Sequence, residues 1–324
     1  MGKRVLGIGN ALVDIMVKVE SDERLSEFSL PKGSMQLVDE EKSDYVKKGL
    51  EKDDKSVSPG GSAANTIHAL GMLGTHPGFI GSTGHDDTGE LFIRELKNAG
   101  VDPIIFRRSC PTGTAVALVT PDSERTFATH LGAAVELNAG ELNEDLFSGY
   151  DILYLEGYLI INYDLTLKAC RLAREHGMKV ALDLSSYNVV ESNRERFEEI
   201  MTGYVDILFA NEEEAKAFTG RLPEEALGIL AGICPVAVVK TGSRGSLIRR
   251  GEEIVRVEAI DVIPVDTTGA GDMYAAGFLY GYAGEATLER CGEFGSFLAG
   301  SVIQYMGAKL PPGEWPSIKA RLRI

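Results

Sequence analysis

The sequence predicts an α/β fold: a doubly wound, mostly parallel central sheet flanked by helices, with a small β-sheet beside it. Short apolar runs rich in β-branched residues recur along the 324 residues, and several are continuous rather than alternating. Continuous runs are typical of strands buried on both faces of a parallel sheet. From about residue 150 onward these runs alternate with helical stretches, which is the order of a doubly wound sheet.

The expected strands are 4–9, 78–82, 115–120, 151–157, 179–184, 205–210 and 236–242. The expected helices each end in a glycine, a common helix stop: 64–74, 87–100, 163–177 and 211–220. Two regions, about 11–45 and 104–130, predict β-structure with turns instead, and "TPDSE" predicts a hairpin in the second. We therefore expect a single domain over residues 1–324 with a discontinuous β lid built from these two regions.

The net charge of -15 and the pI near 4.9 argue against a surface for nucleic acid or for anionic membranes. The four cysteines are scattered without metal-ligand spacing, which predicts reduced thiols in a cytoplasmic protein. The N-terminal segment predicts a first strand rather than a signal peptide, and no run has the apolar length of a membrane span. A monomer and a homodimer both remain open.

The strongest candidate site is "PVDTTGAGDMYAAGFLYG" at 264–281. The Gly269-Ala270-Gly271 turn follows a strand-like run and opens a helix, so its N–H groups form a site for an anion such as phosphate. Asp272 lies in the first helical turn, where a carboxylate can accept a proton from an attacking hydroxyl. The alternative is that Asp272 only complements the helix dipole. The turn is not a Walker A loop, because no lysine follows the glycines.

"DTTGAGD" resembles the signature of the ribokinase-like (PfkB) carbohydrate and nucleoside kinases. The resemblance implies that Asp272 is the catalytic base and that the Gly269 to Gly271 turn lines the anion hole. It also implies that the protein is an enzyme that transfers the γ-phosphoryl group of ATP to a primary hydroxyl, with Mg²⁺. Two rival classes are a catalytically silent ligand sensor of the same fold and a dinucleotide-dependent oxidoreductase. The second lacks a GxGxxG fingerprint here.

Two N-terminal segments resemble the acceptor-binding elements of the same family. "SPGGSAANTIHALGMLG" (58–74) resembles its second signature, which implies that Gly61 lies against the substrate and that Asn65 bonds a sugar hydroxyl. "GNALVDI" (9–15) places Asn10 and Asp14 where the family holds sugar hydroxyls. The alternatives are an ordinary Gly-Gly turn and an ordinary turn at the end of a strand.

Three further segments resemble nucleotide and cation sites of the family. Asn211 and Glu214 in "NEEEAKAF" resemble an Asn-x-x-Glu element that organises Mg²⁺ mostly through water, although an N-cap alone explains them equally. Asp266 and Thr268, with the loop around Gly307, are placed where the family holds a monovalent cation such as K⁺. A glycine-bracketed loop after strand 236–242 is expected to border ATP, and its candidate residues are Lys240, Thr241, Gly242, Ser243 and Gly245.

The acceptor stays divided between adenosine, which we favour, and a free sugar such as fructose, ribose or a keto-sugar acid. The step from Asn10 to Asp14 and the segments 35–39 and 111–134 resemble the adenosine kinase branch. On that reading Gln36 lies near the nucleoside and Tyr158 stacks on adenine. Glu156 instead resembles the sugar-binding glutamate of ribokinase-like members.

Arg125 lies at the tip of the expected hairpin, in "DSERTF". When the lid closes, an arginine there can reach the β- and γ-phosphates of ATP and help to exclude water. The alternative is an ordinary solvated turn arginine beside Glu124.

Overall fold

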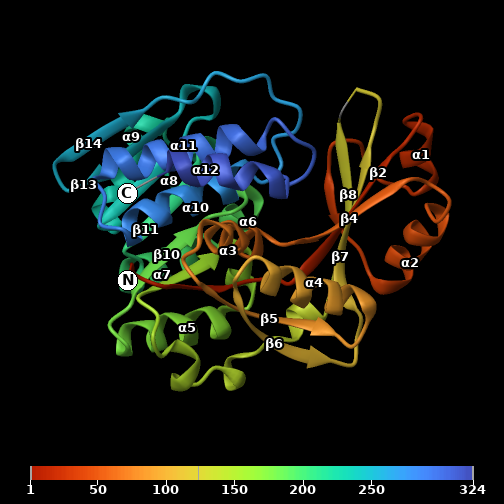
Figure 1. Ribbon diagram of the computed structural model, residues 1–324, viewed down its shortest axis with the longest axis horizontal. Coiled ribbons are helices and arrows are strands. Elements are labelled where there is room, and N and C mark those ends of the chain that lie inside the picture. The colour runs from red at the N-terminus through yellow and green to blue at the C-terminus, as the bar shows by residue number, and fades with distance from the viewer. Residues whose placement is uncertain (1, 123, 323–324) are drawn as a thin grey trace.

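The structure, a computed structural model, describes residues 2–122 and 124–322, which form one sheet of nine strands and one of five. The larger sheet has the order β14-β13-β12-β11-β10-β9-β1-β5-β6. Its strands from β12 to β6 run parallel, and β13 and β14 add an antiparallel edge. In Figure 1 this sheet lies between helical layers, and the smaller sheet stands to the right of it. The predicted fold class is confirmed.

The strands of the larger sheet are β1 (Val5–Ile8), β5 (Gly78–Gly84), β6 (Asp102–Arg108), β9 (Ile152–Glu156), β10 (Lys179–Asp183), β11 (Ile207–Asn211), β12 (Val236–Lys240), β13 (Ser246–Arg250) and β14 (Glu253–Val257). Its helices are α3 (Ser62–Leu73), α4 (Asp87–Asn98), α5 (Tyr163–Glu175), α6 (Tyr187–Ser192), α7 (Arg194–Tyr204), α8 (Glu212–Thr219), α9 (Pro223–Ile233), α10 (Ala270–Ala283), α11 (Leu288–Val302) and α12 (Trp315–Arg321). The expected strands and helices of this sheet agree with these bounds to within about two residues.

Two apolar clusters hold the helices onto the larger sheet. Side chains of α3, α4, α10, α11 and α12 pack on one face, and those of α5, α7, α8 and α9 pack on the other. Strands such as β9 and β10 are therefore buried on both faces, which explains their continuous apolar sequence. The glycines Gly74 and Gly220 end α3 and α8 in the left-handed conformation, as the sequence predicts.

The smaller sheet has the order β3-β8-β7-β2-β4 and is built from Leu12–Lys18 (β2), Met35–Leu37 (β3), Lys55–Gly60 (β4), Thr112–Val119 (β7) and Arg125–Gly132 (β8). Two helices, α1 (Glu23–Glu27) and α2 (Glu40–Gly49), cover the face that points away from the larger sheet (Figure 1). We call the opposite face the inner face. Strand register assigns to it Leu12, Asp14, Met16, Met35, Leu37, Ala115, Ala117, Arg125 and Phe127.

The expected lid boundaries need three corrections. β4 belongs to the smaller sheet although it lies outside both expected regions, and β6 belongs to the larger sheet although it overlaps the region 104–130. Residues 11–45 also contain helix α1 and the start of α2, where the sequence predicted β-structure. These differences arise because strand partners come from distant parts of the chain, which local pattern does not report.

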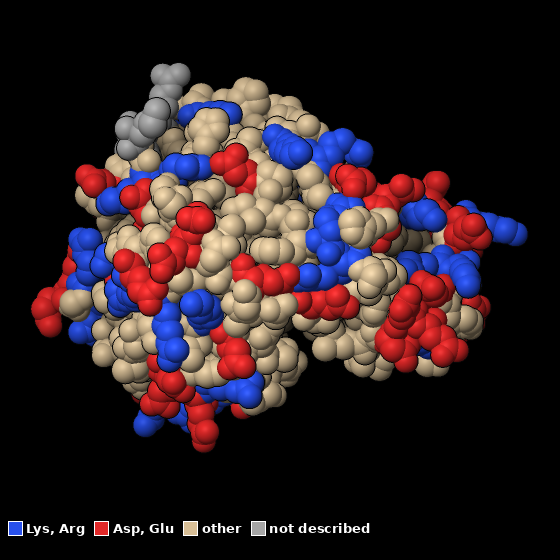
Figure 2. All heavy atoms as spheres, turned by 90° about the horizontal axis from the view of Figure 1, so that it is seen from below, with Lys and Arg blue, Asp and Glu red and all other residues tan. Residues whose placement is uncertain are grey.

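Charged residues of both signs are interspersed over the face that Figure 2 shows, and the surface narrows there between the larger body and the lobe that carries α1 and α2. None of the helices in the described part of the chain combines the length and apolar character needed to cross a membrane.

Candidate active site

Polar side chains lie at or just past the carboxyl ends of neighbouring parallel strands. They are Asn10 after β1, Glu156 of β9, Asp183 of β10, Asn211 of β11 and Lys240 of β12. The chain order reverses between β1 and β9, since β5 and β6 extend the sheet on one side and β10 to β12 on the other. Ligands of open α/β sheets bind outside the carboxyl ends of the strands at such a switch point. The candidate site therefore lies along this edge.

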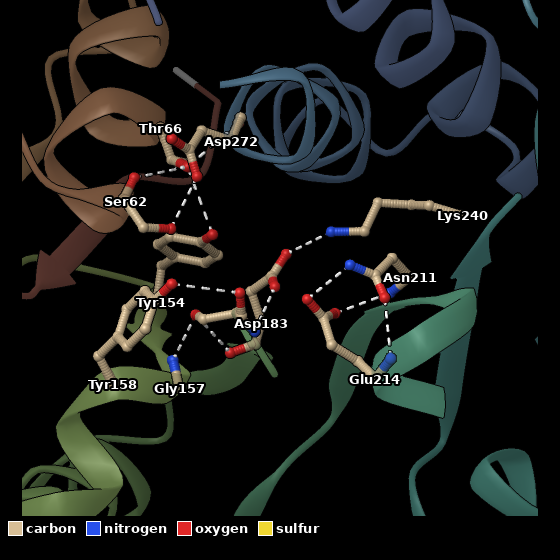
Figure 3. Close-up of polar contacts among 11 residues, drawn as sticks. Ser62, Thr66, Tyr154, Gly157, Tyr158, Asp183, Asn211, Glu214, Lys240 and Asp272 are labelled. Carbon is tan, nitrogen blue, oxygen red and sulfur yellow. Dashed lines mark hydrogen bonds and ion pairs between the residues drawn. The ribbon is translucent and has the colours of Figure 1, made fainter. Parts of the chain in front are cut away.

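Asp272 lies in the first turn of α10 and faces the N-terminal turns of α3. Its Oδ1 accepts a hydrogen bond from Ser62 Oγ at 2.7 Å, and its Oδ2 accepts one from Asn65 Nδ2 at 3.0 Å. Thr66 donates to the main-chain oxygen of Asp272 at 3.1 Å and joins the two helices (Figure 3). Burial raises the pKa of Asp272 to about 7, against the bonds from Ser62 and Asn65, which lower it. Asp272 is thus oriented and poised as a base near neutral pH.

The glycine turn before Asp272 is shaped by close packing. Gly269 has φ +75° and caps α10, and a Cβ there would lie 2.6 Å from the Cα of Ala308. We expected the N–H of Ala270 to face a ligand. It donates instead to the Thr267 carbonyl inside the turn. Within the described residues, the N–H groups of Gly271 and Asp272 have no acceptor. These two N–H groups at the start of the helix are available to an anion.

A lysine places positive charge beside this anion site. Lys240 Nζ lies 2.7 Å from Asp183 Oδ2, and a Cβ on Gly271 would lie 3.2 Å from the same nitrogen. Burial alone would lower the pKa of Lys240, but the carboxylates of Asp183 and Glu214 outweigh it and raise that pKa. Lys240 is therefore charged at the edge of the anion site, and Figure 3 shows it extending toward Asp183.

Asn211 and Glu214 form the complete capping box of α8. Glu214 N–H donates to Asn211 Oδ1 at 2.8 Å, and Asn211 N–H donates to Glu214 Oε2 at 2.7 Å. Burial, followed by the charge of the nearby Asp183, raises the pKa of Glu214 to about 7. The capping alternative is therefore realised, and it leaves a buried carboxylate at the strand edge.

The loop after β12 is closed by its own hydrogen bonds. The N–H and Oγ1 of Thr241 both donate to the Gly245 carbonyl, at 2.8 and 3.0 Å. Gly242 and Ser243 are exposed at its tip, and Arg244 pairs with Glu212 at the start of α8. This loop thus presents an open turn next to the capping box.

Glu156 and Asn10 are joined in the interior rather than open to a ligand. Glu156 is 1% exposed and accepts from the N–H and Nδ2 of Asn10, at 3.0 and 2.6 Å, and from Ala63 N–H at 2.8 Å. Gly61 has φ +96°, and a Cβ on it would overlap the Asn10 carbonyl oxygen. Glu156 therefore ties β1 to the start of α3, which argues against its expected contact with a sugar.

Asp14 is the carboxylate of the inner face. A Cβ on Gly60 would overlap its carboxyl group, so Asp14 lies directly over the Gly-Gly turn. Burial raises the pKa of Asp14 to about 6, with Lys309 opposing the shift. Burial also lowers the pKa of Lys309 to about 8, against Asp14 and Glu95, and lowers that of His68 to about 3. Asp14, Lys309 and His68 thus form one partly desolvated group beside the turn.

Three other candidates make contacts within the protein, and their expected contacts with a ligand stay predictions. Gln36 pairs in register with Ala128, which packs in the cluster under α1 and α2, so Gln36 lies on the face away from the larger sheet. Tyr158 directs its hydroxyl to the Ser185 carbonyl at 3.4 Å. Arg125 contacts Asp266 at 2.7 Å, three residues before the glycine turn. We therefore do not retain Gln36 as a base contact.

Sequence reasoning missed Ser62, Asp183 and Lys309. Asp183 ends a buried strand, and that position alone is a signal, because strand ends carry the ligand groups of such sheets. Ser62 follows the Gly-Gly turn directly, but its bond to Asp272 joins residues 210 positions apart. No motif in the sequence around Lys309 marks it as a site residue.

Similar proteins are found among protein families, curated proteins and solved structures. The model of the pfkB family carbohydrate kinases matches residues 33–314. A solved adenosine kinase from Sinorhizobium meliloti shares 36% identity and a TM-score of 0.88, covering 99% of this chain and 100% of that one. A probable sugar kinase from Rhizobium etli shares 34% identity and a TM-score of 0.90, with all of both chains covered. Adenosine kinase from Saccharomyces cerevisiae is 27% identical, over 94% of this chain and 96% of its own.

Proposed function

This chain belongs to the PfkB family of carbohydrate kinases, and we propose that it transfers the γ-phosphoryl group of ATP to the primary hydroxyl of adenosine. Membership of the family makes it a phosphotransferase that acts on a hydroxyl group. The nucleoside acceptor and the roles of individual residues are our proposal.

Asp272 takes the proton of the acceptor hydroxyl in this mechanism. Proton removal occurs late, because the transition state of phosphoryl transfer is loose and the developing charge lies mainly on the phosphoryl oxygens. Ser62 and Asn65 hold the carboxylate in one orientation, at 2.7 and 3.0 Å. The pKa of about 7 leaves Asp272 basic enough to accept the proton without being protonated throughout at neutral pH.

The developing negative charge is met by the N–H groups of Gly271 and Asp272 and by the ammonium group of Lys240. These donors are fixed before the substrate binds, so they stabilise the transition state without reorganisation. They also let a chain of net charge -15 bind ATP, since the positive field is local.

The residues present fit a magnesium ion held mainly through water. Asp183, Glu214 and Asp272 place three carboxylates around the single ammonium of Lys240, and Asp183 raises the pKa of the other two. Within the described residues no three such side chains lie close enough together to chelate a metal directly, so in this proposal the ion is held through water and shared with the phosphates. Asp183 and Glu214 would hold the ion, whose chemistry is to neutralise phosphate charge.

The single observation that favours a nucleoside over a free sugar is the apolar character of the inner face. Strand register places Met16, Met35, Leu37 and Phe127 on this face. The side chains of Met35 and Leu37 are 48% and 60% exposed, so they do not belong to the core. A nucleobase offers a flat apolar surface to methionine and aromatic side chains, whereas a free sugar offers hydroxyl groups. Asp14 on the same face can accept both hydroxyls of a ribose.

A free sugar is the second candidate, because Asp14, Asn65 and Asp272 together form a polar floor that suits any polyol. The names of the similar proteins divide in the same way, between adenosine kinase and sugar kinase. On this alternative Met35 and Leu37 only shield the site from water.

The test is release of ADP from Mg-ATP with adenosine, other nucleosides, fructose, ribose and 2-keto-3-deoxygluconate, with Asp272→Asn as the inactive control. We expect the highest kcat/KM with adenosine. Turnover confined to one sugar would show that the acceptor is that sugar rather than adenosine. Hydrolysis or turnover that survives in the Asp272→Asn control would refute the assigned base.

A further inference from the structure

Arg125 forms an ion pair that joins the smaller sheet to the segment before α10. It is the first residue of β8 on the inner face, and its Nη2 lies 2.7 Å from Asp266 Oδ2 in the segment that leads to the glycine turn. The Asp266 side chain is fully buried and the Arg125 side chain is 13% exposed. The same nitrogen lies 3.8 Å from Met306 Sδ. The smaller sheet is thus anchored by one guanidinium group beside the catalytic turn.

Asp266 organises the segment on which the glycine turn depends. Its Oδ1 accepts from Thr268 N–H at 2.7 Å, and its Oδ2 accepts from Gly307 N–H at 2.6 Å. Gly269 then packs against Ala308, the residue after Gly307. The position of Asp266 therefore sets the distance between the glycine turn and the loop that supports it.

A buried carboxylate of this kind needs a cation, because two N–H donors do not balance a full negative charge away from water. The resemblance to the family implies a monovalent cation near Asp266 and Thr268. In this chain the positive charge next to Asp266 is instead the guanidinium of Arg125. A K⁺ ion would have to share a carboxylate that already has three donors, and it would lie next to a like charge. The residues present do not fit K⁺ while Arg125 is docked.

We propose that Arg125 is a positioning residue that replaces the monovalent cation: its docking on Asp266 orders the phosphate-binding turn and couples that order to the position of the smaller sheet. Turnover is then independent of K⁺, and the turn is fully formed only when the inner face approaches the larger sheet. The proposal rests on phosphoryl transfer at Asp272 but not on the identity of the acceptor.

The experiment compares the wild-type chain with Arg125→Ala, Arg125→Lys and Lys32→Ala in KCl, NaCl and tetramethylammonium chloride at equal ionic strength. Lys32→Ala is the matched control, since Lys32 pairs with Asp122 on the exposed side of the same hairpin. Two quantities are measured: ADP release with the best acceptor of the panel, and the midpoint of thermal unfolding without substrates. The second readout decides the proposal even if no acceptor in the panel is used.

For the wild-type chain, and likewise for Lys32→Ala, we expect the same rate and the same unfolding midpoint in all three salts. Arg125→Ala should lose about tenfold or more in kcat, because a displaced turn misaligns the transferred group. K⁺, or guanidinium at concentrations far below those that unfold proteins, should restore part of the rate and raise the unfolding midpoint of Arg125→Ala alone. Arg125→Lys should keep most of the rate.

Two results would overturn the proposal. One is a wild-type chain whose rate or unfolding midpoint depends specifically on K⁺. The other is Arg125→Ala that responds to neither K⁺ nor guanidinium in either readout, which would make Arg125 an ordinary structural or phosphate-binding arginine.

Discussion

Replacing Asp272 by asparagine should inactivate the protein and at the same time stabilise it above pH 7. The carboxylate is held in a desolvated position, so its charge opposes folding. Loss of a general base lowers kcat by roughly 10²–10⁴-fold. In the wild-type chain the rate should fall as the pH drops below about 7, where Asp272 becomes protonated.

The size of the stabilisation follows from the pKa in the folded and unfolded chains. Burial raises the pKa from 3.8 to about 7. The favourable contribution of Asp272 is therefore complete below about pH 4, and it is lost as the pH rises to about 7, because the unfolded chain gives up its proton first. Each pH unit in that window is worth about 1.4 kcal/mol, so the whole loss is at most about 4 kcal/mol.

The local geometry allows the substitution without a new clash. An introduced amide keeps the shape of the carboxylate and can accept from Ser62 Oγ as before. Its NH₂ group needs an acceptor, and the buried Oδ1 of Asn65 has no hydrogen-bond partner among residues 2–122 and 124–322. Rotation of the Asn65 amide by half a turn would bring that oxygen to the new donor. The variant should then fold normally at every pH tested.

The assay is urea unfolding between pH 5 and pH 9, followed by the fluorescence of Trp315, the single tryptophan, which is buried. The unfolding free energy of Asp272→Asn should exceed that of the wild type by about 2–3 kcal/mol more at pH 8 than at pH 5. Asp164→Asn is the control, since Asp164 is exposed in the first turn of α5. A pH-independent difference, or a variant less stable than the wild type at pH 8, would refute the raised pKa.

Three further substitutions test other parts of the site. Gly269→Ala should lower kcat and destabilise the fold by about 1–3 kcal/mol, since φ is positive at Gly269 and Ala308 leaves no room for a side chain. Gly74→Ala is the control, because Gly74 also has a positive φ, of +91°, but faces open space. This variant should keep full activity in the same assays. Lys240→Met should raise the KM for ATP about tenfold. It should also move the acidic limb of the kcat/KM profile to higher pH, because Lys240 lowers the pKa of Asp272. An acidic limb that does not move would contradict this effect of Lys240 on Asp272. Asp14→Asn should raise the KM for the acceptor about tenfold or more while the KM for ATP stays within twofold, and equal effects on both would remove Asp14 from the acceptor site.

Much of the fold could be predicted from the sequence because its signals are local. Continuous apolar runs and glycine stops located β1, β5, β9 to β12 and helices α3, α4, α5 and α8 to within about two residues. β4 and β13 were missed, the strand-like run before the glycine turn contains β14 but is longer than that strand, and helix α1 and the start of α2 lie where β-structure was expected. Short elements of this kind depend on their partners more than on their own composition.

The candidate site was predictable where its residues adjoin glycine turns. The string from Asp266 to Asp272 carries more glycine than a turn requires, so Asp272 could be named from its neighbours in the sequence, whereas Asn65 and Asp14 were named from the resemblance of their segments to the family. The face of a strand is harder to assign from sequence alone, because one residue of register moves a side chain to the other side. For this reason the sequence did not show that Gln36 lies on the opposite face, whereas Met35 and Leu37 lie on the inner face.

The sequence by itself determined the fold class, the family and the place of the glycine turn, because each of these depends on residues close together in the chain. Only the tertiary structure decided which polar groups face one another. It joined Ser62 and Asn65 to Asp272, placed Lys240 between Asp183 and Gly271, turned Glu156 inward to Asn10, and set Arg125 against Asp266. These pairs connect residues that are far apart in the chain, and their partners become neighbours only when parallel strands align their carboxyl ends and the smaller sheet packs above them.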